Sequence, residues 1–383
     1  MSLKLENKKR PRTEIGSISP PPLRRKRHAD ASEEVVEHHQ PKSKDDDAFQ
    51  IFSWNVNSIT HLLPKTQRSI KSFFAPPSPQ GEGQDEDGGS KSVSLRDFLK
   101  RHRWPQYVGL QEVKISPKDE ITKRTVEKAA NGDEGPAYRA YFALPRDRYN
   151  ATGWGGKVYG VCTLLRHDLA SLSGQKTKEV DWDLEGRVLV TELPSLEMKL
   201  VIINGYWVNG TTNPYRSPET GQVFGTRHDR KRQFHSLMLE EVKSYQAKGW
   251  EVVLVGDMNI ARTPLDGCPG IRLGLEHVKN RVDFNHKFFD DENGMHAIDS
   301  WRWIHGNKRG YSYHGEKAED WGSSCDRVDL GMVTRGIVDR KALVGAEIYE
   351  SVLDRGGSDH VPISLVLSTK VIMTALSTSV DVG

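Results

Sequence analysis

The chain has 383 residues, of which 36% are hydrophobic and 28% are charged. No apolar run approaches the roughly 18 residues of a membrane-spanning helix, which excludes an α-helical membrane protein. Its first residues carry charges where a signal peptide would have an apolar core, so we expect no secretion. The three cysteines, Cys162, Cys268 and Cys325, form no CxxC motif, so we expect neither a disulfide framework nor a zinc site. These features favour a reducing intracellular compartment.

The net charge of +3 is unevenly distributed along the chain. Residues 1–28 carry 9 Lys and Arg against 2 acidic residues, whereas residues 29–48 carry 2 against 7. Residues 1–48 also lack aromatic residues and apolar periodicity, so we expect a disordered arm. Two basic clusters in this arm, 8–12 and 24–27, have the spacing of a two-part nuclear import signal, which predicts the nucleus. The alternative is a solvated tail that touches phosphate backbones.

From Phe49 onward, short apolar runs rich in β-branched residues predict strands. These runs lie at 49–54, 107–111, 158–165, 187–193, 199–206, 251–257, 327–333 and 361–367. A helix is expected after Ser94, which has the side chain of an N-cap residue. A second helix is expected at about 228–248, where apolar residues recur at helical spacing, namely Phe234, Leu237, Met238, Val242 and Tyr245. This order of elements predicts a four-layer α/β sandwich, in which two mixed sheets pack face to face and helices flank them.

Polar side chains recur where these predicted strands end. They are Asn55, Glu112, Tyr206, Asn209, Asp257, Asn259, Asp329, Asp359 and His360. A single polar residue at a strand end is usually a loop cap, but the repeated pattern predicts one polar rim above the sandwich. Oxygen-rich ligation with one histidine suits Mg²⁺, with Mn²⁺ as a substitute, and argues against zinc or copper.

Eight short motifs occur in order: SWNVN (53–57), LQEVK (110–114), EGRVLVTEL (185–193), GYWVN (205–209), GDMN (256–259), DSWR (299–302), RVDLGM (327–332) and GSDHVPI (357–363). Together they resemble the endonuclease/exonuclease/phosphatase superfamily, which has a DNase I-like fold. Within it, GYWVN, LQEVK and EGRV resemble the exonuclease III type of abasic-site (AP) endonuclease. The resemblance covers about 49–368, which we expect to be the catalytic domain, followed by a tail at 369–383.

The resemblance implies a role for each polar residue of the rim. Glu112 would be the principal metal carboxylate, in a metal shell drawn from Asn55, Glu112, Asp257, Asn259, Asp359 and His360. Asp257 would deprotonate the attacking water, and Asn259 would hold Asp257 in register. His360, paired with Asp329, would contact the scissile phosphate, and Tyr206 with Asn209 would assist the leaving oxygen. We also expect Arg187, Tyr313, Arg227 and Arg230 to contact DNA. For the basic stretch at 227–232, a solvated helix face is the alternative.

The sequence departs from the family pattern around the expected lesion pocket. Asp326 stands where many AP endonucleases have an aromatic residue, and Val208 replaces the usual proline of the GYWVN motif. Tyr313, within YSYHG (311–315), is the residue we expect to form the hydrophobic wall. Because a flipped-out abasic sugar would occupy this pocket, these changes favour 3′-end trimming or exonuclease action over abasic-site incision.

A second motif lies in a polar insertion at about 64–92. Residues 67–74 read QRSIKSFF, which resembles the peptide by which many replication and repair proteins bind the sliding clamp PCNA. Ile70, Phe73 and Phe74 would fall on one face of a helical turn and fill an apolar pocket, while Gln67 would donate a hydrogen bond beside it. The alternative is an amphipathic turn that packs on the domain's own core.

These observations predict a monomeric, Mg²⁺-dependent DNA-repair nuclease. It would hydrolyse phosphodiesters of double-stranded DNA at abasic sites or at blocked 3′ ends, in base excision repair. One alternative is a phosphodiesterase of the same superfamily that acts on a tyrosyl-DNA adduct, RNA or a phosphoinositide. Another is a non-catalytic adaptor bound to the clamp.

Overall fold

The computed structural model describes residues 48–64, 94–153, 157–315 and 325–372. The import signal, the clamp motif at 67–74 and the part of the tail at 373–383 lie outside the described residues. Within the described residues, each helix is too short or too polar to cross a membrane.

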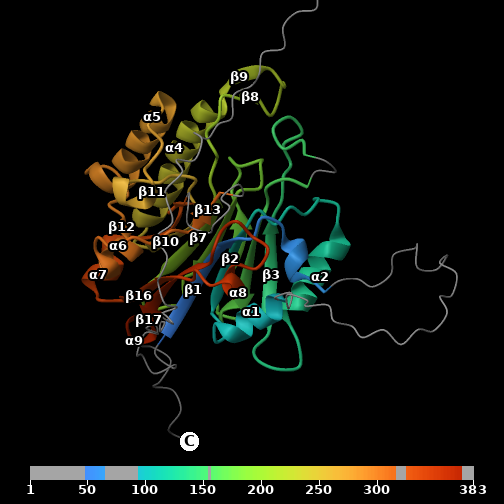
Figure 1. Ribbon diagram of the computed structural model, residues 1–383. Coiled ribbons are helices and arrows are strands. Elements are labelled where there is room, and N and C mark those ends of the chain that lie inside the picture. The colour runs from blue at the N-terminus through green and yellow to red at the C-terminus, as the bar shows by residue number, and fades with distance from the viewer. Residues whose placement is uncertain (1–47, 65–93, 154–156, 316–324, 373–383) are drawn as a thin grey trace, which may run out of the picture. The chain divides into compact units, whose positions relative to one another are not determined.

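Two six-stranded sheets form the centre of the fold (Figure 1). The first sheet has the strand order β16 (Leu343–Ile348), β17 (Ile363–Ser368), β1 (Ala48–Asn55), β2 (Tyr107–Gln111), β4 (Val161–Arg166) and β3 (Tyr138–Ala143). The second has the order β12 (Ile298–Asp299), β15 (Asp329–Val333), β10 (Glu251–Asp257), β7 (Leu200–Tyr206), β6 (Val188–Leu193) and β5 (Lys176–Glu179). Both sheets are mixed, because β1 runs parallel to β2 and β7 runs parallel to β10.

Alternating residues of the central strands build the layers. In β7, Ile202 packs in the core between the two sheets, whereas the next residue, Ile203, packs in a second core with Phe234 and Met238 of α4 (Arg227–Gln246). This alternation follows from the period of two in a strand, which places successive side chains on opposite faces. The predicted four-layer sandwich is confirmed.

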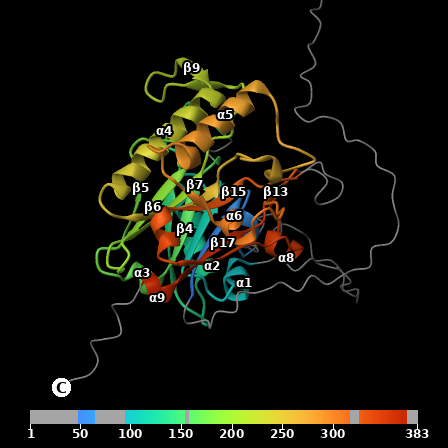
Figure 2. The ribbon, with the colours of Figure 1, turned by 90° about the vertical axis from the view of Figure 1, so that its left-hand side faces the viewer.

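Helices flank the sheets. Beside α4 they are α1 (Leu95–Arg101), α2 (Glu120–Ala130), α3 (His167–Ala170), α5 (Leu275–Asn285), α6 (Ser300–His305), α7 (Arg335–Asp339), α8 (Val352–Arg355) and α9 (Thr369–Ile372). As predicted, Ser94 caps α1, where its hydroxyl accepts a hydrogen bond from the backbone N–H of Asp97. The helix predicted at 228–248 is α4, although Leu237 is only half-buried. Helices α4 and α5 lie side by side in both views (Figures 1 and 2).

The sequence analysis missed several elements. They are the edge strands β3, β5, β12 and β16, every helix except α1 and α4, the hairpin of β8 (Pro214–Arg216) and β9 (Val223–Thr226), and a small sheet of β11 (Gly267–Cys268), β14 (Cys325–Asp326) and β13 (Tyr313–His314). Edge strands are half-exposed and lack the continuous apolar run that identifies a central strand. Short helical turns at Ile59–Leu62, Pro264–Asp266 and His286–Asp290 complete the described chain.

A buried polar network connects the two sheets. Asn204 of β7 accepts a hydrogen bond from Gln111 Nε2 at 2.8 Å and donates one to the carbonyl of Cys162 at 2.9 Å. Gly109 makes room for it, because a Cβ there would lie 2.9 Å from Asn204 Cγ. Both sheets therefore approach closely near the ends of β2 and β7.

We expect Asn204→Ala to lower the free energy of unfolding by about 2–3 kcal/mol, because it removes the side-chain donor to the buried Cys162 carbonyl and one of the three acceptors of the Gln111 amide. Urea unfolding followed by circular dichroism measures this, with Asn213→Ala, an exposed position, as the control. Equal stability of the two variants would contradict a stabilising role for the network.

Candidate active site

The site lies where the two parallel strand pairs end. Asn55 is the last residue of β1, and Glu112 follows β2, its parallel neighbour. In the second sheet, Tyr206 and Asp257 are the last residues of β7 and β10 and stand opposite each other in register. Parallel strands present their carboxyl ends at the same edge of a sheet, so each pair delivers two polar side chains to one place.

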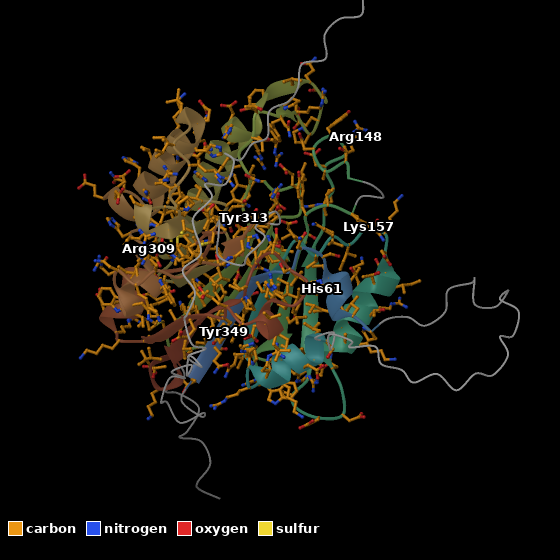
Figure 3. The ribbon with its side chains drawn as sticks, viewed as in Figure 1. His61, Arg148, Lys157, Arg309, Tyr313 and Tyr349 are labelled. Atoms are coloured by element: carbon orange, nitrogen blue, oxygen red, sulfur yellow. The ribbon has the colours of Figure 1, made fainter. Side chains whose placement is uncertain are left out.

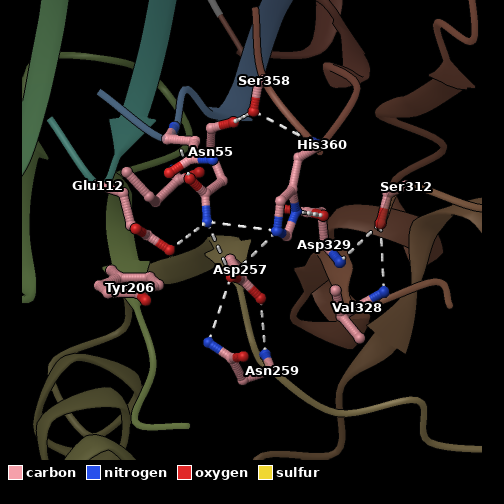
Figure 4. Close-up of polar contacts among 12 residues, drawn as sticks. Asn55, Glu112, Tyr206, Asp257, Asn259, Ser312, Val328, Asp329, Ser358 and His360 are labelled. Atoms are coloured by element: carbon pink, nitrogen blue, oxygen red, sulfur yellow. Dashed lines mark hydrogen bonds and ion pairs between the residues drawn. The ribbon is translucent and has the colours of Figure 1, made fainter. Parts of the chain in front are cut away.

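Asn55 connects the two sheets at this edge (Figure 4). Its Nδ2 donates to Glu112 Oε1 at 3.1 Å and to Asp257 Oδ2 at 3.0 Å. Its Oδ1 accepts from the backbone N–H of Asn57 at 3.0 Å, which keeps the amide nitrogen directed into the site. Asn55 therefore holds one carboxylate from each sheet beside the other.

Asp257 is buried and held by Asn259 as well. Its Oδ1 accepts from the backbone N–H of Asn259 at 2.8 Å, and its Oδ2 accepts from Asn259 Nδ2 at 3.2 Å. Asn259 also donates to the carbonyl of Trp207 at 3.0 Å. Both Asn259 and Glu112 adopt positive φ angles, 53° and 51°, a conformation that is uncommon outside glycine and is often found at functional sites.

His360 forms a buried pair with Asp329. Its Nδ1 lies 2.7 Å from Asp329 Oδ2, and its Nε2 faces Asp257 Oδ2 at 3.9 Å. Ser358 orients the segment, because its hydroxyl donates to the carbonyl of Asn55 at 2.6 Å and accepts from the backbone N–H of His360 at 3.1 Å. Ser312 supports the partner, since its hydroxyl accepts from the backbone N–H of Asp329 at 3.0 Å.

Burial and charge shift the pKa values of these groups in opposite directions. Burial and the carboxylate of Asp329 raise the pKa of Asp257 well above its ordinary value, although His360 opposes this. Burial alone would lower the pKa of His360, but Asp329 and Asp257 outweigh it and raise that pKa to about 10. His360 is therefore a cation at neutral pH, with two carboxylates as its partners.

Glu112 and Tyr206 form the other side of the site. Burial acts to raise the pKa of Glu112, but Lys114, whose Nζ lies 3.0 Å from Glu112 Oε2, and hydrogen bonds from Tyr206 and Asn55 bring it below its ordinary value. Burial and the charge of Glu112 raise the pKa of Tyr206 well above its usual range. Glu112 is thus ionised while Tyr206 keeps its proton.

The remaining predicted residues line one pocket with this cluster. Asn209, Asp359 and Tyr313 all contribute to its wall. The Tyr313 ring lies 4.9 Å from the His360 ring, and Tyr313 occupies the middle of the face shown in Figure 3. The structure thus brings together all nine predicted rim residues, with Tyr313 beside them.

The cluster fits a hard divalent cation. Ligand atoms of Asp257, Asp329 and His360 lie within 4.8 Å of one another. While His360 is protonated it has no lone pair for a metal, so the carboxylates are the ligands available to a cation. Asp329 Oδ1 is buried and has no hydrogen-bond partner among the described residues. Several buried carboxylates repel one another, and a cation with oxygen ligands would relieve that repulsion. Asp329, which we did not expect in the metal shell, belongs among the candidate ligands.

The three arginines expected at DNA are buried elsewhere. Arg187, Arg227 and Arg230 surround the carboxylate of Glu185, with nitrogen–oxygen distances of 2.9, 2.7 and 3.5 Å. The alternative of a solvated helix face at 227–232 is wrong for Arg227 and Arg230, because both side chains are at most 10% exposed. The structure therefore gives these arginines a structural role, and their contact with DNA stays a prediction.

Four further residues of the site were missed at first. Lys114 and Ser358 lie inside the quoted motifs, at two-residue spacing from Glu112 and His360, so the motifs carried a signal for them. Ser312 lies inside the quoted segment YSYHG (311–315), directly before Tyr313, whereas Lys231 had no such signal. Lys231 of α4 is only 2% exposed and donates to the carbonyl of Asn259 at 2.8 Å, yet its stretch read as an exposed basic run.

We expect Glu185→Gln to lower the free energy of unfolding by about 3 kcal/mol or more at pH 7, because three buried guanidinium groups lose their carboxylate. Burial opposes ionisation, but the arginines lower the pKa of Glu185 to about 2. This pKa lies below the unfolded value of about 4.3, so the contribution is present above about pH 4 and is lost as the pH falls towards about 2.

Urea unfolding of both proteins at several pH values measures this difference. Glu219→Gln, at an exposed position, is the control. A stability difference that stays constant down to about pH 2 would contradict the ion-pair explanation.

Comparisons with known proteins agree with this geometry. In the mouse, DNA-(apurinic or apyrimidinic site) endonuclease 2 is 29% identical over 212 residues, which make up 50% of this chain and 37% of the mouse protein. The chain thus spans little more than a third of the length of that relative.

Solved structures share the fold. The APE2 catalytic domain of Xenopus laevis matches 86% of this chain and 97% of its own, with a TM-score of 0.54 and 20% identity. The AP endonuclease LMAP of Leishmania major matches 86% of this chain and 92% of its own, with a TM-score of 0.59 and 17% identity. The model of the Endonuclease/Exonuclease/phosphatase family matches residues 52–360, which span the whole polar cluster from Asn55 to His360. The chain belongs to the Endonuclease/Exonuclease/phosphatase family.

Proposed function

We propose that the protein is a Mg²⁺-dependent DNA-repair nuclease. It hydrolyses phosphodiesters at abasic sites, at 3′ ends, or at both, as a step of base excision repair, and Mn²⁺ can replace Mg²⁺. The observation that carries the proposal is the position of Asp257, which Asn55 and Asn259 hold beside a His360–Asp329 pair. The names of the mouse, Xenopus and Leishmania relatives support AP endonuclease activity.

Asp257 is the general base of the proposed reaction. Two amide groups fix its carboxylate, so one orientation towards a water molecule is maintained. Its raised pKa makes it a stronger base than an ordinary carboxylate, which favours removal of a proton from the attacking water. A divalent cation held by Glu112 and the neighbouring metal-shell residues would leave Asp257 free to act as the base and would supply positive charge at the phosphate.

His360 stabilises charge on the phosphate, and Tyr206 assists the leaving group. His360 is cationic, and Asp329 fixes its ring, so its Nε2 can donate to a phosphate oxygen as negative charge develops there. Tyr206 keeps its proton near neutral pH and can donate to the leaving oxygen, with Asn209 on the same pocket wall. Water attack, charge stabilisation and leaving-group assistance are each assigned to a residue of this chain.

A labelled duplex with one central abasic analogue, compared with an undamaged duplex that has a recessed 3′ end, tests the proposed substrate. A single Mg²⁺-dependent cut at the analogue establishes AP endonuclease activity, and a ladder from the 3′ end establishes 3′-exonuclease activity. Cleavage should disappear in EDTA. Inactivity on both duplexes would contradict the proposal and favour a tyrosyl-DNA adduct, RNA or a phosphoinositide as the substrate.

Three single substitutions test the assigned roles. We expect Asp257→Asn, Glu112→Ala and His360→Ala each to lower kcat by about 100- to 10,000-fold, while DNA binding persists. Single-turnover cleavage and fluorescence anisotropy measure the two quantities, and Asp133→Asn, at an exposed position, is the control. Near-normal cleavage rates in any two of these variants would refute the assigned catalytic roles. If the protein is instead a non-catalytic adaptor, it would bind the clamp but show no metal-dependent cleavage.

We further propose that the protein acts in the nucleus and binds the sliding clamp PCNA through residues 67–74. The Gln-x-x-Ile-x-x-Phe-Phe pattern supports this. Replacing Phe73 and Phe74 by alanine should remove binding to immobilised clamp and leave cleavage of short duplexes unchanged. A loss of thermal stability in this variant would instead favour packing of the segment on the domain.

A further inference from the structure

One wall of the active-site pocket is basic. Lys231 of α4, His277 and Arg281 of α5, and Arg272 before α5 line it, and the two helices lie side by side (Figures 1 and 2). The same pocket also carries the carboxylates of Glu112, Asp257 and Asp359. The pocket therefore has an acidic part, which fits a cation, and a basic part that the reaction described above does not use.

Lys231 makes no ion pair with a carboxylate in the part of the chain that the structure describes. Its ammonium group is buried, and its hydrogen bonds go to the backbone carbonyls of Asn259, at 2.8 Å, and Met258, at 3.5 Å. Burial lowers the pKa of Lys231 to about 7, although the nearby carboxylate of Asp257 opposes this shift.

Arg281 builds the wall and positions Arg272. The Arg281 guanidinium donates to the carbonyl of Ala261 at 2.9 Å and to that of Arg272 at 2.8 Å, which ties the segment before α5 to the loop after β10. The Arg272 residue itself is exposed, so its side chain stands at the mouth of the pocket. Arg272 is therefore held in place by its backbone while its guanidinium remains accessible to a ligand.

Asp326 is the carboxylate that faces these arginines across the pocket. Arg272 and Arg281 together therefore carry more positive charge than the single carboxylate of Asp326 can neutralise. Phosphate is the anion that arginine recognises best, because the planar guanidinium donates to two phosphate oxygens at once.

We propose that Lys231, Arg272 and Arg281 form a second phosphate subsite, which binds the phosphate one nucleotide away from the scissile phosphate. This inference rests on the proposed function, since the first phosphate is the one placed at Asp257 and His360. The subsite selects substrates in which two phosphates flank one nucleoside. It gives the charged pocket around Asp326 a role that an apolar lesion pocket does not have.

Thymidine 3′,5′-bisphosphate carries two phosphates at this separation and is the probe. Its affinity is compared by isothermal titration calorimetry with those of thymidine 5′-monophosphate and thymidine 3′-monophosphate, with Ca²⁺ in place of Mg²⁺ to slow hydrolysis. We expect the wild-type protein to bind the bisphosphate at least about 10-fold more tightly than either monophosphate, since charged hydrogen bonds contribute this much.

Arg272→Ala should reduce this advantage to about 3-fold or less, because the guanidinium at the pocket mouth is lost. Arg335→Ala is the matched control, since Arg335 is exposed on α7 and lines a different hollow. Unchanged thermal unfolding of Arg272→Ala shows that the variant is folded.

Three results would overturn the subsite: equal affinity for the bisphosphate and both monophosphates, an advantage that persists in Arg272→Ala, or no bisphosphate binding at millimolar concentration. Tight bisphosphate binding without cleavage of either duplex would leave the subsite in place and refute only the DNA-repair activity. Cleavage of a duplex without tighter binding of the bisphosphate would support the DNA-repair activity and refute only the subsite.

Discussion

The alignment of two parallel strand pairs is the constraint on which the site depends. One pair, β1 and β2, lies in the first sheet, and the other, β7 and β10, lies in the second. Because the sheets pack face to face, the carboxyl ends of both pairs meet, and Asn55 donates across the gap to Asp257. A shift of either pair by one residue would turn its terminal side chain to the opposite face of the sheet.

Acidic and basic side chains lie in different parts of the active-site pocket. The carboxylates gather at the strand ends, where His360 compensates part of their repulsion and a divalent cation would compensate more. The basic side chains Lys231, Arg272 and Arg281 come from α4, α5 and the segment before α5. A phosphodiester strand matches both parts, since one phosphate needs a cation and a nucleophile while its neighbour needs only positive charge.

A second buried cluster of charged residues, around Glu185, contacts the active site through Tyr206. Glu185 pairs with three arginines, and one of them, Arg187, packs its guanidinium over the rings of Tyr159 and Tyr206, at 3.8 and 4.8 Å from their centroids. Arg187 also donates to the Tyr206 carbonyl at 3.1 Å. The basic run at the start of α4 therefore helps to orient Tyr206, although its sequence resembles a surface for nucleic acid.

The sequence alone determined the strands that carry the site, the four-layer fold and the nine polar residues of the rim. Central strands are continuous apolar runs, and polar residues that end several such runs are visible without coordinates. Edge strands such as β3 and β16 escaped detection, because their exposure weakens the pattern. Only the tertiary structure showed whether the basic residues of α4 are exposed. The sequence of Arg227, Arg230 and Lys231 predicted a solvated or DNA-binding surface, yet all three side chains are buried. Glu185 lies more than 40 positions earlier in the chain, and burial of a charge depends on such a distant partner, which no local pattern can specify.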